Sequence, residues 1–132
     1  MKKIVFALIM ATVVFASFPS CKKSKADSEA GLVVETTPAN KSNNLNILGP
    51  DFPLKVDITS VIPASGAKIE ITATAEGVAE AFFTATSYSS APQNNYVITN
   101  TPNGFTCVVN ITVTSLSKST NVWKGTYRYS KK

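Results

Sequence analysis

The chain has 132 residues, which is enough for one domain with a single hydrophobic core. It contains no histidine, so it lacks the usual general base of hydrolases and the commonest metal ligand. The formal net charge is +5, but from Gly31 onward 8 Lys and Arg residues stand against 6 Asp and Glu residues, a net +2 that argues against nucleic-acid binding.

The first twenty residues have the pattern of an export signal. Met1-Lys2-Lys3 supplies a positive start, and residues 4–18 form an uncharged apolar stretch. A membrane-spanning helix needs about 20 apolar residues, so a permanent anchor helix is the less favoured alternative. We therefore expect a signal peptide over residues 1–20.

A cysteine follows this stretch directly, in the sequence Phe18-Pro19-Ser20-Cys21. These residues resemble a bacterial lipobox, in the loose form of lipoproteins from Bacteroidota-type bacteria. The resemblance implies that Cys21 is acylated, with palmitate-like chains, and becomes the first residue of a membrane-anchored mature protein. The alternative is cleavage after Ala16, which leaves Cys21 as a free thiol or as a disulfide partner of Cys107.

The residues after the cysteine indicate which membrane holds the protein and how the domain is tethered to it. Lipoproteins held at the inner membrane tend to have an aspartate there, whereas this chain has Lys22, so the resemblance implies the outer membrane and leaves its periplasmic and surface faces open. Residues 22–30 carry five charges and no large apolar side chain. We expect residues 21–30 to form the lipidated cysteine and a solvated tether.

From Gly31 the apolar residues alternate with polar ones, as they do along a β-strand with one buried face. The clearest strands are expected at 68–75, 105–115 and 122–129. Weaker patterns predict strands at 32–36, 55–60, 81–87 and 95–99, between turn-forming residues. The segment from Glu76 to Ser87 has some helix-forming residues, but Phe82, Phe83 and Thr84 favour a strand there.

About seven strands in residues 31–132 resemble an immunoglobulin-like or fibronectin-type-III-like antiparallel β-sandwich. Residues 38–53 have no clear strand pattern and are expected to cross irregularly between the two sheets. The antibody hallmarks are absent, because Cys107 has no earlier cysteine within the domain and Phe105 replaces the tyrosine of a tyrosine corner. Alternation of Phe105, Cys107 and Val109 predicts that Cys107 is a buried core thiol.

No residue pattern indicates catalysis, a metal site or a cofactor, so we expect a protein that is not an enzyme. The aromatic residues Trp123, Tyr127 and Tyr129 share one strand face, where they could pack in the core or form a platform for sugar rings. The polar opposite face favours the core. Residues 87–96, rich in Tyr, Ser and Asn, could be a binding loop or a disordered hairpin tip.

The sequence therefore predicts a membrane-anchored, non-enzymatic module of the bacterial envelope that binds a protein or has a structural role. The alternative is a carbohydrate-binding accessory lipoprotein that uses Trp123, Tyr127 and Tyr129. The partner, an envelope protein or a glycan, is not identified by any motif.

Overall fold

The computed structural model describes residues 29–43 and 45–132, in which eight strands and no helix are found. The predicted signal peptide (1–20), Cys21 and most of the predicted tether lie outside the described residues. The strands are β1 (Val34–Thr37), β2 (Leu45–Ile47), β3 (Phe52–Ile58), β4 (Ala67–Ala75), β5 (Ala81–Ser89), β6 (Gln93–Ile98), β7 (Thr106–Ser115) and β8 (Val122–Lys131). The all-β prediction is confirmed.

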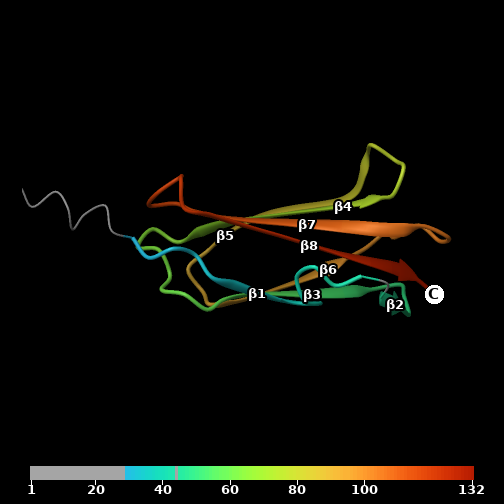
Figure 1. Cartoon of the computed structure of the whole chain (residues 1–132), viewed down its shortest axis with the longest axis horizontal. Coiled ribbons are helices and arrows are strands. Elements are labelled where there is room, and N and C mark those ends of the chain that lie inside the picture. The colour runs from blue at the N-terminus through green and yellow to red at the C-terminus, as the bar shows by residue number, and fades with distance from the viewer. Residues whose placement is uncertain (1–28, 44) are drawn as a thin grey trace, which may run out of the picture.

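The strands form two facing layers (Figure 1). One sheet has the order β1-β3-β6, and the other has the order β2-β8-β7-β4-β5. All neighbours run antiparallel except β2, which is parallel to β8. The architecture is therefore the predicted β-sandwich, with one more strand than the sequence pattern indicated.

The core lies between the inner faces of the two sheets, where apolar side chains recur at every second position. On β4 and β7 the alternation predicted from the sequence is confirmed, because Ile69, Ile71, Val109 and Ile111 are all buried. The smaller sheet contributes the inward residues Phe52, Leu54, Val56 and Ile58 from β3. Burying this apolar surface is the main stabilisation of the domain.

The segment 38–53 crosses between the sheets, as expected, but it is less irregular than its sequence suggests. It contains β2, which adds to the far edge of β8 with Leu45 opposite Tyr129, and the start of β3. Pro53 is part of β3 although proline usually breaks a strand. It pairs with Val97 on β6, and β1 ends opposite Lys55, so the missing N–H of Pro53 costs no bond to β1.

Two local predictions are wrong. Residues 87–96 are neither a disordered hairpin tip nor a long loop, because β5 continues to Ser89, β6 begins at Gln93, and the two strands belong to different sheets. Phe105 is not on the core face of β7: it precedes the strand, and 45% of its side chain is exposed.

Candidate functional site

The three aromatic residues of β8 do not form an exposed platform. Tyr127 and Tyr129 are 2% and 0% exposed, and the Tyr129 ring packs against Phe52, with ring centroids 4.7 Å apart. Burial raises the pKa of Tyr127 and raises that of Tyr129 to about 12, since both lose contact with water. The core interpretation is correct for the tyrosines, and a sugar could not stack on them.

Trp123 lies between the buried core and the exposed surface. It is partly buried and packs against the margin of the core, with its indole lying over Gly125 two residues along β8. A Cβ atom at Gly125 would come within 2.8 Å of Cζ3 of the ring, so glycine provides the space that the indole occupies. Without the two tyrosines beside it on the surface, Trp123 alone does not make a sugar-stacking face.

Cys107 is a free and fully buried thiol on β7, as the alternation predicted. Burial, with a smaller contribution from the negative charge of Glu76, raises the pKa of this thiol. A raised pKa disfavours the thiolate that nucleophilic and metal-binding cysteines require. Cys107 therefore acts as a small apolar core residue.

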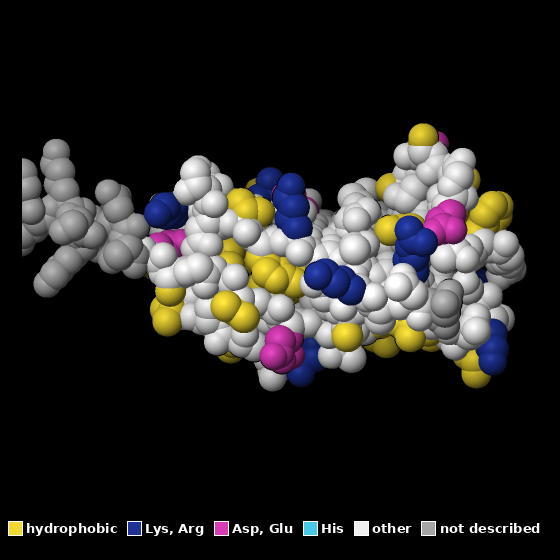
Figure 2. All heavy atoms as spheres, viewed as in Figure 1, with side chains coloured by type: hydrophobic (Ala, Val, Ile, Leu, Met, Phe, Trp, Pro, Cys, Tyr) yellow, Lys and Arg dark blue, Asp and Glu magenta, His cyan; other side chains and the backbone are white. Residues whose placement is uncertain are grey.

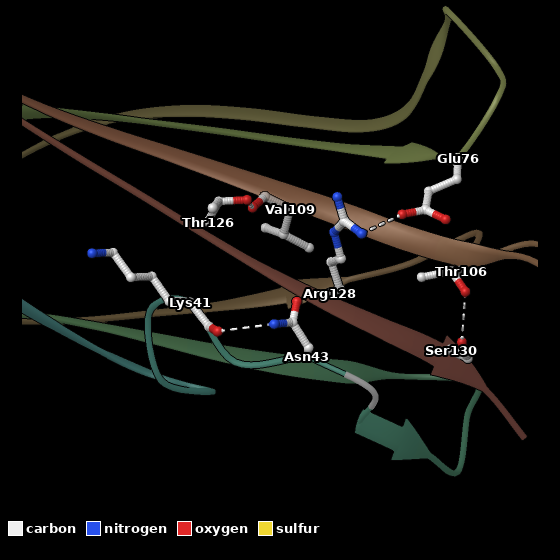
Figure 3. Close-up of polar contacts among 8 residues, drawn as sticks. All are labelled: Lys41, Asn43, Glu76, Thr106, Val109, Thr126, Arg128 and Ser130. Atoms are coloured by element: carbon white, nitrogen blue, oxygen red, sulfur yellow. Dashed lines mark hydrogen bonds and ion pairs between the residues drawn. The ribbon is translucent and has the colours of Figure 1, made fainter.

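The outer face of the larger sheet is polar around β7 and β8 (Figure 3). Arg128 forms an ion pair with Glu76 at 2.9 Å, and Ser130 donates a hydrogen bond to Thr106 across the two strands. Thr126 donates to the carbonyl of Val109 at 2.9 Å. These bonds satisfy the polar groups that form them and converge on no common point.

The edge of β8 that does not face β7 lies against the crossover segment, residues 38–53. The amide of Lys41 donates to the carbonyl of Thr126 at 2.6 Å, and the amide of Arg128 donates to the carbonyl of Ser42 at 3.0 Å. Figure 3 shows the loop around Lys41 and Asn43 beside β8, and β2 continues this cover along the last residues of the strand. This edge of the sheet is therefore covered from Thr126 to Lys131.

The opposite edge, formed by β5, is open. Among the described residues β5 pairs only with β4, so half of its backbone N–H and C=O groups point away from the sheet. Its nine residues, AFFTATSYS, include no charge and no proline. One bulge, near Ala81, interrupts the pairing, and the register with β4 is regular from Phe83 to Ser89.

The neighbouring edge of the smaller sheet, β6, lies on the same side of the sandwich and is also uncharged. Ser87 on β5 and Tyr96 on β6 share a hydrogen bond of 2.6 Å that fixes the two edges relative to each other. We call β5 and β6 together the open side. The sequence carried one signal of it, the absence of charge from Ala81 to Tyr96 together with the strand-forming residues at 82–88.

A groove of about 500 Å³ lies on the outer face of the smaller sheet. Its lining residues come from the crossover and from β3 and β6, and they include Pro38, Ile47, Pro53, Lys55 and Val97. The Lys55 ammonium is 3.2 Å from the Asp57 carboxylate, so its charge is already matched. The lining is largely apolar and has no cluster of polar groups that would orient a small ligand.

Within residues 29–43 and 45–132 no group of three His, Cys, Asp or Glu side chains is placed to hold a metal ion. No helix in the same part of the chain is long and apolar enough to cross a membrane. Comparisons with family models, with curated proteins and with solved structures find no match for this chain.

Proposed function

We propose that the protein is a lipid-anchored, non-enzymatic module of the bacterial envelope that binds another envelope protein through its open side. The observation that carries the proposal is the asymmetry of the larger sheet, whose β8 edge is covered from Thr126 to Lys131 while its β5 edge is free along its whole length. Proteins usually protect a free edge with charges, prolines or short strands. Apart from the bulge near its start, β5 has none of these protections.

The chemistry of the open side suits an extended segment of a partner protein. Such a segment adds to a sheet edge as a further strand, and main-chain hydrogen bonds supply the affinity. Exposed side chains beside the edge, Thr84, Thr86 and Tyr88, are uncharged and would pair with the side chains of an added strand. The partner is therefore a protein with a free extended segment of low charge.

The strand order supports an immunoglobulin-like assignment of the sandwich. In immunoglobulin domains one sheet contains strands C, F and G, in which the penultimate strand F lies between strand C and the last strand G. Without the short β2 of the crossover, β4 is the third strand of this chain and corresponds to strand C. Here β7 lies between β4 and β8, and the other sheet has the order β1-β3-β6. Modules of this architecture have many functions, so the assignment supports a binding role only together with the open edge.

The anchor is proposed from the sequence before the sandwich. Ser20-Cys21 after a short apolar run resembles a lipoprotein cleavage site, and a multiply acylated cysteine holds a protein firmly to a bilayer. Lys22 after the cysteine supports placement at the outer membrane. In this account the sandwich is held at a membrane and presents its open side to other envelope proteins.

Photo-cross-linking in intact cells tests the binding role. A photoreactive residue replaces Thr86 on β5 in the full-length protein, and Lys124 on β8, also exposed on the outer face of the sheet, is the matched control position. We expect an adduct with a defined envelope protein from position 86 and none from position 124. No adduct at position 86, or the same adduct from both positions, would contradict the proposal.

Proline variants then test whether the contact is strand addition. Successive residues of an edge strand direct their N–H groups alternately toward the neighbouring strand and away from it. Of Thr84→Pro and Ala85→Pro, one therefore removes a bond to β4 and the other removes only an outward N–H. We expect the variant that keeps the parental melting temperature to lose the adduct, and an undiminished adduct would exclude strand addition.

A further inference from the structure

The N-terminal end of the described chain is hydrogen-bonded to side chains where β7 ends and the β7–β8 loop turns. Asn121, in the β7–β8 loop, donates to the Glu29 carboxylate at 2.6 Å and to the carbonyl of Ala30 at 2.9 Å, and it accepts the amide of Leu32 at 3.0 Å. Hydrogen bonds from Ser115 and from Asn121 lower the pKa of Glu29. The preceding chain therefore leaves the sandwich from a defined point.

Two further loops lie at the same end. The carbonyl of Val33 accepts the amides of Thr59 and Ser60, and the amide of Leu116 donates to the carbonyl of Gly66 at 2.9 Å. We call residues 29–33, 59–66 and 116–122 together the anchor end. In Figure 1 it is the left end of the sandwich, where the described chain begins and the β7–β8 loop turns. Backbone hydrogen bonds join these three segments, so they lie side by side at one end of the sandwich.

The anchor end exposes large apolar side chains that no described residue covers. Val61 is 74% exposed, Val33 is 55% exposed and Leu116 is 44% exposed, and each comes from a different segment. Hydrophobic side chains are visible on the surface near this end in Figure 2. Exposed apolar residues that occur singly are common, but three on joined loops at one end form a surface that favours a less polar neighbour.

The chain before Glu29 indicates what that neighbour is. Seven residues separate Cys21 from Glu29, and the eight Cα–Cα steps that join them span at most about 29 Å when extended. If Cys21 carries lipid, the anchor end is always held within that distance of the bilayer. The opposite end of the ten-residue strands β7 and β8 is about 30 Å further away.

We propose that the anchor end docks on the lipid surface, with Val33, Val61 and Leu116 in the headgroup region. This inference rests on the lipid anchor of the proposed function. Docking replaces contact with water by contact with the apolar boundary of the bilayer, as it does for other interfacial surfaces. The strands then stand upright on the membrane, and the open side faces partners that lie beside it.

Fluorescence quenching by lipid tests the docking. The Val61→Cys protein is extracted from membranes of the producing cells and labelled at position 61 with an environment-sensitive dye. It is then reconstituted in phosphatidylethanolamine–phosphatidylglycerol vesicles whose acyl chains carry a quencher. Acylated Cys21 and buried Cys107 do not react with the dye. Val78→Cys is the matched control, because Val78 is also exposed but follows β4 at the opposite end.

We expect the dye at position 61 to shift its emission to shorter wavelength and to be quenched several-fold more than the dye at position 78. Flotation of the vesicles is measured in the same samples. A protein that floats but is quenched equally at both positions, or at neither, would overturn the docking and leave the anchor intact. A protein that does not float would overturn the anchor and the docking together.

Discussion

The hydroxyl of Tyr129 on β8 and the hydroxyl of Thr101 in the β6–β7 loop share a hydrogen bond of 2.6 Å inside the sandwich. Both residues are buried, Tyr129 fully. The bond joins the last strand of one sheet to the loop that leaves the last strand of the other. It therefore fixes the end of the domain far from the anchor end.

Replacing Tyr129 by phenylalanine removes this bond and leaves the Thr101 hydroxyl buried without a partner. We expect Tyr129→Phe to lower the free energy of unfolding by about 1 to 3 kcal/mol, measured by chemical denaturation. Tyr127→Phe is the matched control, because the Tyr127 hydroxyl forms no hydrogen bond with a side chain of residues 29–43 or 45–132, so its loss should change stability less. Equal losses in the two variants would show that the bond contributes nothing.

Tyr129 should also make the folded domain less stable in alkali. Burial raises its pKa from 10 to about 12, so above pH 10 the unfolded chain loses this proton while the folded chain retains it. The stability contributed by neutral Tyr129 is thus complete below pH 10 and declines as the pH rises toward 12. We expect a shallower decline for Tyr129→Phe in denaturation curves taken across this range, and identical slopes would contradict the shifted pKa.

Gly125 is predicted to control the position of the only tryptophan. The Cβ atom of Gly125→Ala would overlap the indole of Trp123, so the ring must swing away from the core margin. We expect tryptophan emission to move to longer wavelength and the free energy of unfolding to fall by about 1 to 3 kcal/mol. Gly31→Ala, where the added Cβ would have open space, should alter neither property.

Asn121 is predicted to hold the start of the domain in place. Asn121→Ala removes three hydrogen bonds to residues 29–32, so the amide of Leu32 should exchange with solvent markedly faster in hydrogen-exchange measurements. Asn43→Ala, which removes only a weak 3.4 Å bond to the carbonyl of Lys41, is the control. Unchanged protection of Leu32 would mean that other contacts fix this end.

Much of the fold could be predicted from the sequence, because long alternating runs specify both strand and buried face. β4 and β7 each have a buried residue at every second position, so the alternation predicted these two strands and their buried faces but not their pairing with each other. β2 could not be predicted, because its three residues are ordered by the bonds of β8 rather than by a pattern of their own. The start of β3 within the segment 38–53 was also not predicted, because Pro53 fits a strand only where β1 has already ended.

The candidate site was less predictable than the fold. Alternation places Trp123, Tyr127 and Tyr129 on one face, but it does not reveal that the smaller sheet covers the tyrosines fully and the tryptophan only in part. The open β5 edge is a property of sheet order, which depends on long-range pairing. The anchor end likewise depends on loops that are far apart in sequence and meet only in the folded chain.

The location of the protein, its docking on the bilayer and its access to envelope partners all depend on the lipid anchor at Cys21. The most direct measurement is the intact mass of the protein extracted from membranes of the producing cells. The account predicts a chain of 112 residues, the 132 of the sequence less the 20 of the signal peptide, that begins at Cys21 and carries acyl groups. A water-soluble product that begins at Ser17 and has no added mass would contradict it.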